Sequence, residues 1–279
     1  VKLAADILLN DTAGWENWGA APPAHAWTPA GDNINHFAGT FDGQDYEIRG
    51  LYIDSASDYQ GLFGYVGAGG TVKRVAVAVS RVTGGTFTGG VAGFSAGALA
   101  YCRNAGAVFG YMNVGGVAGY STGTLKGSVN SGAVGGTYQA IGGVAGMNYN
   151  GTVELCQNSG AVGGSASGTG GVTGGNQGTL RNSYNTGAVS SSGEDYTGGV
   201  TGWNEAAHKL TNCYSTGNIS GFGSFVGGVA GINVGFIQNS YYQAGTAGTA
   251  TTNHSVGSTD RVSDKTAAEM KDAAFAALL

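Results

Sequence analysis

Residues that could do acid–base chemistry are sparse in this chain and mostly stand apart from one another. Of the 279 residues, 17 are Asp or Glu, 12 are Lys or Arg and four are His. Cleavage of a polysaccharide needs two carboxylates at one bond, or a Lys or Arg base beside Ca²⁺-binding acids. Between residues 59 and 246 the acids are Glu154, Glu194, Asp195 and Glu205. Their spacing favours a non-catalytic chain over an enzyme.

One loop gathers several polar residues that could hold a ligand. In the stretch SSSGEDYTG, Glu194 and Asp195 precede Tyr196, and Glu205 follows the next glycine-rich segment. Glu194, Asp195 and Glu205 could approach one edge of the fold. A solvated loop with exposed charges explains the same residues without a ligand. The acids of FDGQDYE, at residues 41–47, are open to the same two interpretations, a cation site or an Asp-Gly turn.

The remaining candidates do not assemble into a cofactor or metal site. The four histidines, at positions 25, 36, 208 and 254, are scattered, and none has a Ser or Cys partner in a nucleophile motif. The Gly-x-Gly stretches follow no strand–helix pattern, so they do not indicate a phosphate-binding loop. We therefore expect no cofactor and no bound metal.

The composition indicates a folded chain with many tight turns. Glycine supplies 55 residues and proline three, which excludes collagen, and 42% of the residues are hydrophobic, too many for a disordered linker. No basic cluster favours nucleic acid, and no apolar run is long enough to span a membrane. Because the chain starts at Val1, we expect it to be a fragment of a larger protein, with any export signal outside it.

A tag of the form Gly-Gly-Val-(Ala/Thr)-Gly recurs along the chain. It begins at residues 89, 115, 142, 170, 198 and 227, at spacings of 26, 27, 28, 28 and 29 residues. A related GLFG at residues 61–64 completes seven units that end near residue 245. Each unit contains short β-prone runs bounded by Gly or Asn. This period fits one coil of a β-solenoid, in which stacked coils bury each other's apolar residues.

Aligned units form columns of equivalent residues that predict an interior. Strand spacing sets the rise at about 4.8 Å per coil, so each column becomes a stack along the rod. Two aliphatic columns are expected in the core: Val91, Val117, Val144, Val172, Val200 and Val229, and Leu99, Leu125, Val153, Leu180, Leu210 and Ile237. Glycines are expected at corners, and asparagines in turns where their amides can also bond from coil to coil.

The three cysteines share one column of small residues. Cys102, Cys156 and Cys213 lie two coils apart, with serines between them. Their Cα atoms would therefore be about 10 Å apart, whereas a disulfide needs a separation within about 7 Å. We predict three free, buried thiols.

Tyr184, Tyr214 and Tyr241 fall on three successive coils, directly after the small-residue column. Strand alternation would point them outward, about 4.8 Å apart, as a flat aromatic strip. Sugar rings pack on such strips, so the three tyrosines are a candidate glycan platform. A row of cross-strand aromatic pairs that stabilises the sheet is the alternative.

The unit resembles the GLUG repeat of bacterial secreted and surface proteins, which include adhesin-like proteins and non-catalytic parts of IgA-protease-type enzymes. The strict Gly-Leu-x-Gly motif occurs once, at residues 61–64, and later units replace Leu with Val. The following pattern, L-x-N-(S/C)-Y-x-T-G-x-(V/I), matches at residues 180–189 and 210–219. Residues 37–53 and 264–279 look like the usual start and end of such arrays. The resemblance implies a right-handed parallel β-helix and an extracellular or cell-surface setting, and it implies no reaction.

Three segments are expected along the chain. Residues 1–58 would form an N-terminal cap with the strands that lead into the array, because an open solenoid end needs covering. Residues 59–246 are the repeats, and residues 247–279 are a C-terminal extension. A capping box of Thr266 with Glu269 and an apolar face predict a helix over about residues 266–279.

The sequence thus favours an all-β fold, a right-handed parallel β-helix of about seven coils. We expect it to serve as a non-catalytic rigid spacer or adhesive stalk of a secreted or cell-surface bacterial protein. A carbohydrate-binding module is the alternative, using the tyrosines or the loops before each tag, and a polysaccharide-cleaving enzyme is the third interpretation. The expected partners are a polysaccharide or a host or cell-surface glycoprotein, and other domains of the same larger chain.

Overall fold

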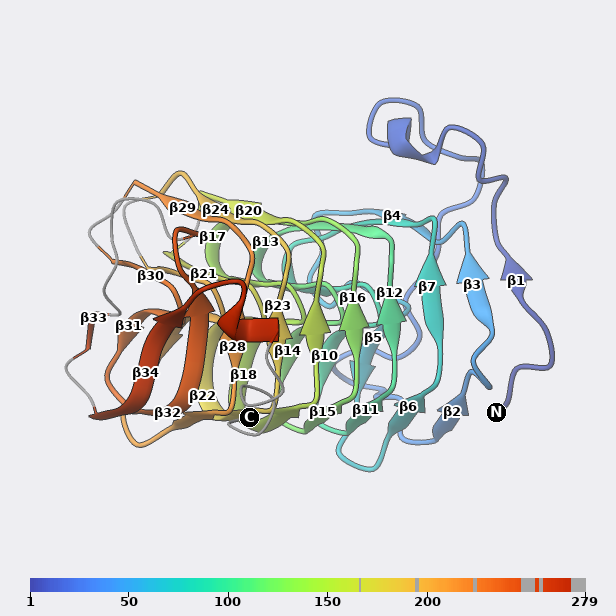
Figure 1. Cartoon of the computed structure of the whole chain (residues 1–279). Helices are drawn as coiled ribbons and strands as arrows, with labels where there is room; N and C mark the ends of the chain where they lie inside the picture. Colours follow the sequence, from blue (N-terminus) through green and yellow to red (C-terminus); the bar gives the residue numbers. More distant parts are fainter. Residues whose placement is uncertain (166, 194–195, 223–224, 247–253, 256–257, 272–279) are drawn as a thin grey trace.

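The chain folds into an all-β parallel solenoid of about seven coils, which confirms the fold predicted from the repeat. The structure, a computed structural model, describes residues 1–165, 167–193, 196–222, 225–246, 254–255 and 258–271. Figure 1 shows the coils stacked as a rod, with the first strands at one end and the strands after the last repeat at the other.

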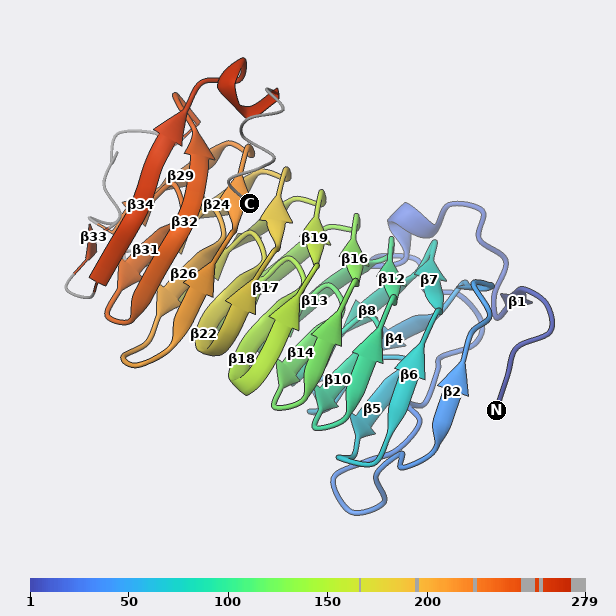
Figure 2. The same cartoon turned by 60° about the horizontal axis from the view of Figure 1, so that its bottom comes forward.

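Equivalent strands of successive coils lie side by side in two sheets, and their pairing is parallel throughout the described part of the chain (Figure 2). In the larger sheet, the strands that follow the tags are β5 (Phe63–Val66), β10 (Ala92–Ser95), β14 (Ala118–Ser121), β26 (Thr201–Asn204) and β31 (Ala230–Asn233), and β33 (His254–Ser255) extends this row by pairing with β31. The next row is β2 (Thr40–Asp42), β6 (Thr71–Lys73), β11 (Ala98–Ala100), β15 (Thr124–Lys126), β27 (Lys209–Thr211), β32 (Phe236–Gln243) and β34 (Ser258–Lys265). Two long strands, β18 (Ala145–Glu154) and β22 (Thr173–Arg181), run through both rows.

A third row and a second sheet complete each coil. The third row is β1 (Ile7–Leu8), β3 (Glu47–Arg49), β7 (Ala76–Ala78), β12 (Arg103–Asn104), β16 (Val129–Asn130), β19 (Gln157–Asn158), β23 (Tyr184–Asn185) and β28 (Tyr214–Ser215). The second sheet contains β4 (Tyr52–Asp54), β8 (Arg81–Thr83), β9 (Thr86–Gly89), β13 (Ala107–Gly115), β17 (Val134–Gly142), β20 (Val162–Gly164), β21 (Ser167–Gly170), β24 (Val189–Ser191), β25 (Thr197–Gly198), β29 (Ile219–Gly221) and β30 (Val226–Gly227).

The core consists of aliphatic side chains stacked on their equivalents in the next coil. Leu99 pairs in register with Leu125, and Val153 pairs with Leu180. All twelve residues of the two aliphatic columns are at most 1% exposed. Burial of each such side chain contributes about 1.5–3 kcal/mol relative to exposure. A single coil would leave these faces in water, so the stack as a whole holds each coil in shape.

Two buried ladders of asparagine side chains run along the rod. The first links Asn104, Asn130, Asn158 and Asn185, each Nδ2 donating 2.8 Å to the next Oδ1. The second links Asn148, Asn176, Asn204 and Asn233 at 2.7–2.8 Å. Several of these amides also bond backbone in their own turn, as Asn158 Nδ2 does to Gly160 O at 2.8 Å. The expectation that the amides bond from coil to coil is confirmed.

Glycines at the coil corners allow one backbone to lie directly on the next. A Cβ atom built on Gly132 would lie 1.9 Å from the carbonyl oxygen of Gly106. The same test at Gly187 gives 2.0 Å to the carbonyl oxygen of Gly160. Both separations are far below contact distance, so any side chain in this column would push adjacent coils apart.

The parallel pairing extends on both sides of residues 59–246. Before the repeats, β2, β3 and β4 pair with β6, β7 and β8, and after them β34 pairs with β32. Aromatic residues of the first segment lie against these early coils. Trp18 is 3% exposed and meets the ring of Tyr52 edge-on, with centroids 5.8 Å apart. The indole nitrogen of Trp27 donates to Leu62 O at 3.0 Å.

The helix expected over about residues 266–279 is not formed in the part of it that the structure describes. The described residues there contain one 3-10 turn, η2 (Glu269–Lys271), and residues 272–279 lie outside the described part. The capping box itself is present, because Thr266 N donates 2.7 Å to Glu269 Oε2 and Glu269 N donates 3.2 Å to Thr266 Oγ1. A short helix needs packing support, and η2, like the early turn η1 (Trp15–Asn17), buries no residue.

Candidate functional site

The three candidate tyrosines form one column with unequal exposure. Tyr184 pairs with Tyr214, and Tyr214 pairs with Tyr241. The rings of Tyr184 and Tyr214 stack with centroids 4.8 Å apart and 3° between their planes, so each covers a face of the other. Tyr241 is 3% exposed and has Lys265 Nζ 5.9 Å from its ring centroid. The column therefore lacks the three open ring faces that a flat aromatic strip would need, because two rings cover each other and the third is buried.

The tyrosine column is also tied to the coil before it. The hydroxyl of Tyr184 donates to Oε1 of Gln157, which is its in-register partner on β19. Burial raises the pKa of the Tyr214 phenol. These contacts are those of cross-strand pairs that stabilise a sheet.

Two of the loop candidates, Tyr196 and Glu205, line one cleft on the surface of the rod. The cleft has a volume of about 350 Å³, which lies within the range of about 300–1,000 Å³ usual for small-molecule sites. The other two candidates, Glu194 and Asp195, lie outside the described residues. The lining residues are Gln139, Ser167, Gln177, Tyr196, Trp203, Asn204, Glu205, Ile232 and Val234.

Trp203 supplies the aromatic wall of this cleft, and two glycines make room for it. A Cβ atom on Gly168 would lie 1.8 Å from Cζ3 of the indole, and one on Gly175 would lie 2.3 Å from Cζ2. Gly175 is the in-register partner of Trp203 on the preceding coil. The indole therefore lies across a gap that the glycines of neighbouring strands leave open.

The column that holds Trp203 is aromatic elsewhere too, but there its rings cover one another. Tyr65 stacks on Phe94 with centroids 4.4 Å apart, and Phe94 stacks on Tyr120 at 5.1 Å. Trp203 instead lies between Gly175 and Ile232. No ring of another described residue stacks on Trp203. In the sequence, this cleft could have been recognised from Gly175 and, at the same position one repeat later, Trp203, which is the single tryptophan of the repeats.

The polar side chains of the cleft come from several coils. Gln139 lies on β17, Ser167 on β21 and Gln177 on β22. Glu205 follows β26; its backbone N–H donates 2.9 Å to Asn176 O, and its Oε1 accepts from Ala206 N–H at 3.3 Å. None of the described residues that line the cleft is a Lys or an Arg. The cleft thus offers amides, hydroxyls and one carboxylate beside an indole, a set suited to binding hydroxyl groups.

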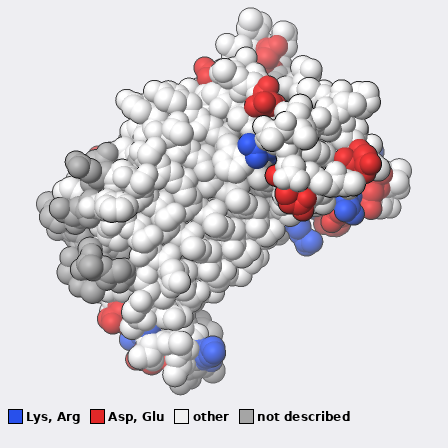
Figure 3. Space-filling model, turned by 90° about the horizontal axis from the view of Figure 1, so that it is seen from above, with Lys and Arg blue, Asp and Glu red and all other residues white. Residues whose placement is uncertain are grey.

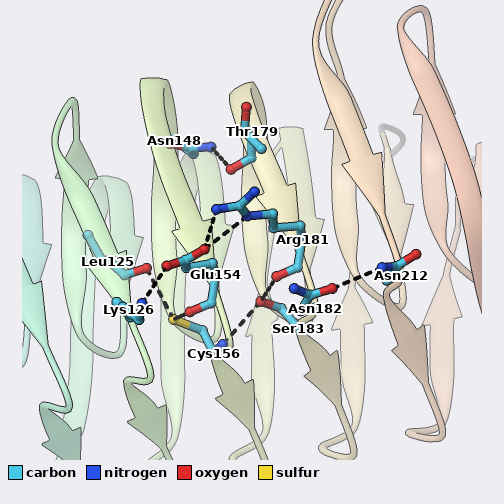
Figure 4. Close-up of polar contacts among 10 residues, drawn as sticks. All are labelled: Leu125, Lys126, Asn148, Glu154, Cys156, Thr179, Arg181, Asn182, Ser183 and Asn212. Carbon is cyan, nitrogen blue, oxygen red and sulfur yellow. Dashed lines mark hydrogen bonds and ion pairs between the residues drawn. The ribbon is translucent and has the colours of Figure 1, made fainter. Parts of the chain in front are cut away.

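Glu154, at the end of strand β18, belongs to a ladder of ion pairs that joins three coils. Glu154 accepts from Lys126 Nζ at 3.1 Å and from Arg181 Nε at 2.9 Å, on the coils before and after it (Figure 4). These two hydrogen bonds, that from Lys126 first, hold the pKa of Glu154 below its usual value. Glu154 is therefore an ionised structural group rather than a general acid.

Asp42, in the FDGQDYE stretch, is likewise paired with cations. It is 3% exposed and accepts from Arg74 Nη2 at 2.7 Å, while Lys73 Nζ lies 3.6 Å away. The hydrogen bonds from Arg74 hold the pKa of Asp42 well below its usual range. The backbone N–H of Gln44 donates to Asp42 Oδ1 at 3.1 Å, which is the geometry of an Asp-Gly turn.

The three cysteines are free and buried. The backbone N–H of Cys156 donates 3.1 Å to Oγ of Ser183 on the next coil (Figure 4), and the other two cysteines bond the following serine in the same way at 3.2 Å. Burial raises the pKa of all three thiols to about 12. Neutral, enclosed thiols of this kind are poor nucleophiles and poor metal ligands.

The described part of the chain has neither a cluster of metal-binding side chains nor a membrane-spanning helix. No group of three or more His, Cys, Asp or Glu side chains in that part lies together as metal ligands would. No helix in the described part of the chain is long and apolar enough to cross a membrane. On the face shown in Figure 3, charged side chains gather mainly toward the N-terminal end, and much of the remaining surface carries none.

Comparison with known proteins shows the fold and short stretches of sequence similarity. No protein-family model matches the chain. The crystal structure of a "putative immunoglobulin A1 protease" from Bacteroides ovatus is similar with a TM-score of 0.58 and 19% identity, over 96% of this chain and 78% of that one. At that identity the similarity shows the fold alone.

Two curated relatives match parts of the chain. A "Putative Gly-rich membrane protein" of Evansella cellulosilytica is 36% identical over 63 residues, 22% of this chain. "Halomucin" of Haloquadratum walsbyi is 35% identical over 112 residues, 39% of this chain. The matched stretches span 7% and 1% of the lengths of these relatives. This chain is therefore similar in sequence to small portions of two longer proteins and similar in fold to the Bacteroides ovatus structure.

Proposed function

We propose that this chain is a non-catalytic β-solenoid module, built from GLUG-type repeats, of a secreted or cell-surface bacterial protein, where it acts as a rigid spacer or adhesive stalk. The observation that carries the proposal is the continuous register from coil to coil, with two buried amide ladders beside an aliphatic core. Because backbone, amide and apolar contacts all join each coil to the next, the stack resists bending. The descriptions of the two relatives, a membrane protein and a halomucin, support a surface setting.

The environment of the acids supports a non-catalytic role. Glu154 and Asp42 are bound to cationic side chains, and in the described part of the chain a single carboxylate, that of Glu205, lines the Trp203 cleft. Hydrolysis of a glycosidic bond by the usual route needs two carboxyl groups on opposite sides of the bond. One carboxylate beside neutral amides is a binding arrangement.

Small-angle scattering of the chain tests the spacer role. We expect a single elongated particle whose maximum dimension is unchanged between low and high salt, because the rod is held by buried contacts that salt does not screen. A flexible or salt-dependent particle would contradict the proposal. Incubation with soluble polysaccharides should release no reducing ends, and their release would favour the enzyme interpretation instead.

A second candidate function, carbohydrate binding, is favoured by the Trp203 cleft. There an indole without a stacked ring lies among polar side chains, as aromatic and hydrogen-bonding groups do in sites for small polar ligands. Tyr184 and Tyr214 contribute less to this proposal, because each covers a ring face of the other. Retardation of the chain in native gels that contain a polysaccharide measures such binding.

A further inference from the structure

We infer that the Trp203 cleft binds a neutral sugar residue of a polysaccharide, an inference that rests on the carbohydrate-binding function proposed above. The site is defined by Trp203, Gln139, Gln177, Tyr196 and Glu205. Gln139, Gln177 and Trp203 lie on β17, β22 and β26, whereas Tyr196 precedes β25 and Glu205 follows β26. Residues far apart in the sequence meet here because the solenoid places one repeat on the next. The cleft is therefore a property of particular coils and not of every repeat.

The indole provides the apolar part of the recognition. The Trp203 ring occupies space that side chains at positions 168 and 175 would fill, because both residues are glycines. The ring also lines the cleft. A pyranose has a face of C–H groups that packs on an aromatic surface, while its hydroxyls point outward from the ring edge. The tyrosine and phenylalanine rings of the same column cannot serve in this way, because they stack on each other.

The polar side chains suit hydroxyl groups. The amides of Gln139 and Gln177 can each donate and accept, and the Glu205 carboxylate accepts only. Paired donors and acceptors of this kind match a hydroxyl, which also does both. A purely apolar ligand would leave these groups unpaired, at a cost in affinity.

The charge of the cleft selects against acidic sugars. Among the described residues that line it, Glu205 is the one charged side chain, and none is a Lys or Arg that could receive a carboxylate or sulfate. A uronic acid in the cleft would place a second carboxylate near Glu205, and like charges in a partly buried site repel. The expected ligand is thus a neutral hexose or pentose unit.

The cleft is held by rigid elements, which favours binding without rearrangement. Asn204, next to Trp203, is part of the second buried ladder and donates 2.8 Å to Asn233 Oδ1. The ring of Tyr196 lies 5.3 Å from that of Phe225 on the next coil. Groups fixed in this way lose little entropy when a ligand binds.

Affinity electrophoresis of the full chain tests the inference, in native gels containing mannan, xylan, a soluble β-1,3-glucan or amylose, with polygalacturonate as the acidic probe. We expect retardation by at least one neutral polysaccharide and weaker retardation by polygalacturonate. Trp203→Met should weaken the neutral interaction about tenfold or more, the loss typical of a central aromatic contact. Methionine is the residue that this column carries at Met147, so it suits the position.

Tyr120→Met is the matched control, since it removes a ring from the same column outside the cleft, and it should leave binding unchanged. Gln177→Ala keeps the indole and should weaken binding severalfold, which tests the site independently if Trp203→Met unfolds. Glu205→Gln should reduce the difference in retardation between the neutral polysaccharides and polygalacturonate, because it removes the repulsion between two carboxylates. Equal binding by the wild type, Trp203→Met and Gln177→Ala would overturn this site but leave carbohydrate binding standing. A wild-type chain that binds none of the neutral polysaccharides would overturn both.

Discussion

Ser183 shows how a single polar residue inside the rod joins two coils. Its Oγ accepts from the Cys156 N–H at 3.1 Å and donates to Arg181 O at 2.8 Å. The side chain is 1% exposed, so water does not replace either bond. Serine and cysteine alternate along this column, and the backbone N–H of each cysteine donates to the serine hydroxyl of the next coil.

Replacing Ser183 should therefore cost stability. Ser183→Ala leaves the Cys156 N–H without an acceptor, and an unsatisfied buried group costs about 1–3 kcal/mol. Urea unfolding followed by circular dichroism measures the free energy of unfolding. Ser190→Ala, at an exposed position, is the control and should change it by less than about 0.5 kcal/mol. Equal effects of the two substitutions would argue against the Ser–Cys bond.

The thiols of this column should be inert in the folded chain. Burial raises the pKa of Cys102, Cys156 and Cys213 to about 12, and only the thiolate reacts with alkylating or disulfide reagents. We expect no reaction of the native chain with dithiobis-nitrobenzoate at pH 8, and reaction of all three thiols in denaturant. Rapid labelling without denaturant would show that this column opens to solvent.

Glu154 predicts a defined pH dependence of stability. Its pKa is lowered on folding, so its ionised form stabilises the fold above the unfolded pKa of about 4.3, and this contribution is lost as the pH falls through the folded pKa. Lys126 and Arg181 are 42% and 49% exposed, so the contribution is at most about 1 kcal/mol. The stability difference between the wild type and Glu154→Gln should shrink as the pH is lowered from about 6 to about 3. A constant difference would mean that the ion pairs contribute nothing.

At the scale of elements, the asparagine ladders show most clearly what joins one coil to the next. Asn158 is 1% exposed; it accepts from Asn130 Nδ2 and donates to Asn185 Oδ1. Asn158→Ala leaves one amide N–H of Asn130 and the backbone N–H of Gly160 without their acceptor, so we expect a loss of about 2–6 kcal/mol, the sum of two unsatisfied buried groups. Thermal and urea unfolding measure it. Asn218→Ala, at an exposed position in the next repeat but one, should have little effect, and a similar loss there would contradict the ladder as the cause.

The sequence predicts those elements that repeat and misses those that occur once. Val172 and Leu180 could be assigned to the core because aliphatic residues occupy the same position in every repeat. Each coil places that position in the same buried environment, so the same residue types are needed there each time. Trp203 breaks the pattern of its column, so its role depends on Gly168 and Gly175, which meet it only after folding. The stacking of Tyr184 on Tyr214 likewise depends on ring orientation, which residue spacing does not specify. The helix expected after Thr266 had a correct cap, but its described residues form only the turn η2, which buries no residue and so lacks packing support.

At the scale of the whole molecule, the rod should tolerate the loss of one complete coil but not of half a coil. Gly115 and Gly142 are in-register equivalents, so deletion of residues 116–142 joins Gly115 to the chain where Gly142 stood. In the deleted coil, Asn130 pairs with both Asn104 and Asn158, and Leu125 pairs with both Leu99 and Val153. After the deletion, Asn104 would therefore face Asn158, and Leu99 would face Val153.

Each coil of a solenoid contacts mainly its neighbours, so we expect this deletion to fold cooperatively and to shorten the rod by about 4.8 Å. Circular dichroism and small-angle scattering measure the two effects. Deletion of residues 116–129 removes about half a coil and would place unlike columns on each other, so it should prevent cooperative folding. If both deletions unfold the chain alike, stability depends on contacts beyond neighbouring coils, and the rod could not lengthen or shorten by whole repeats.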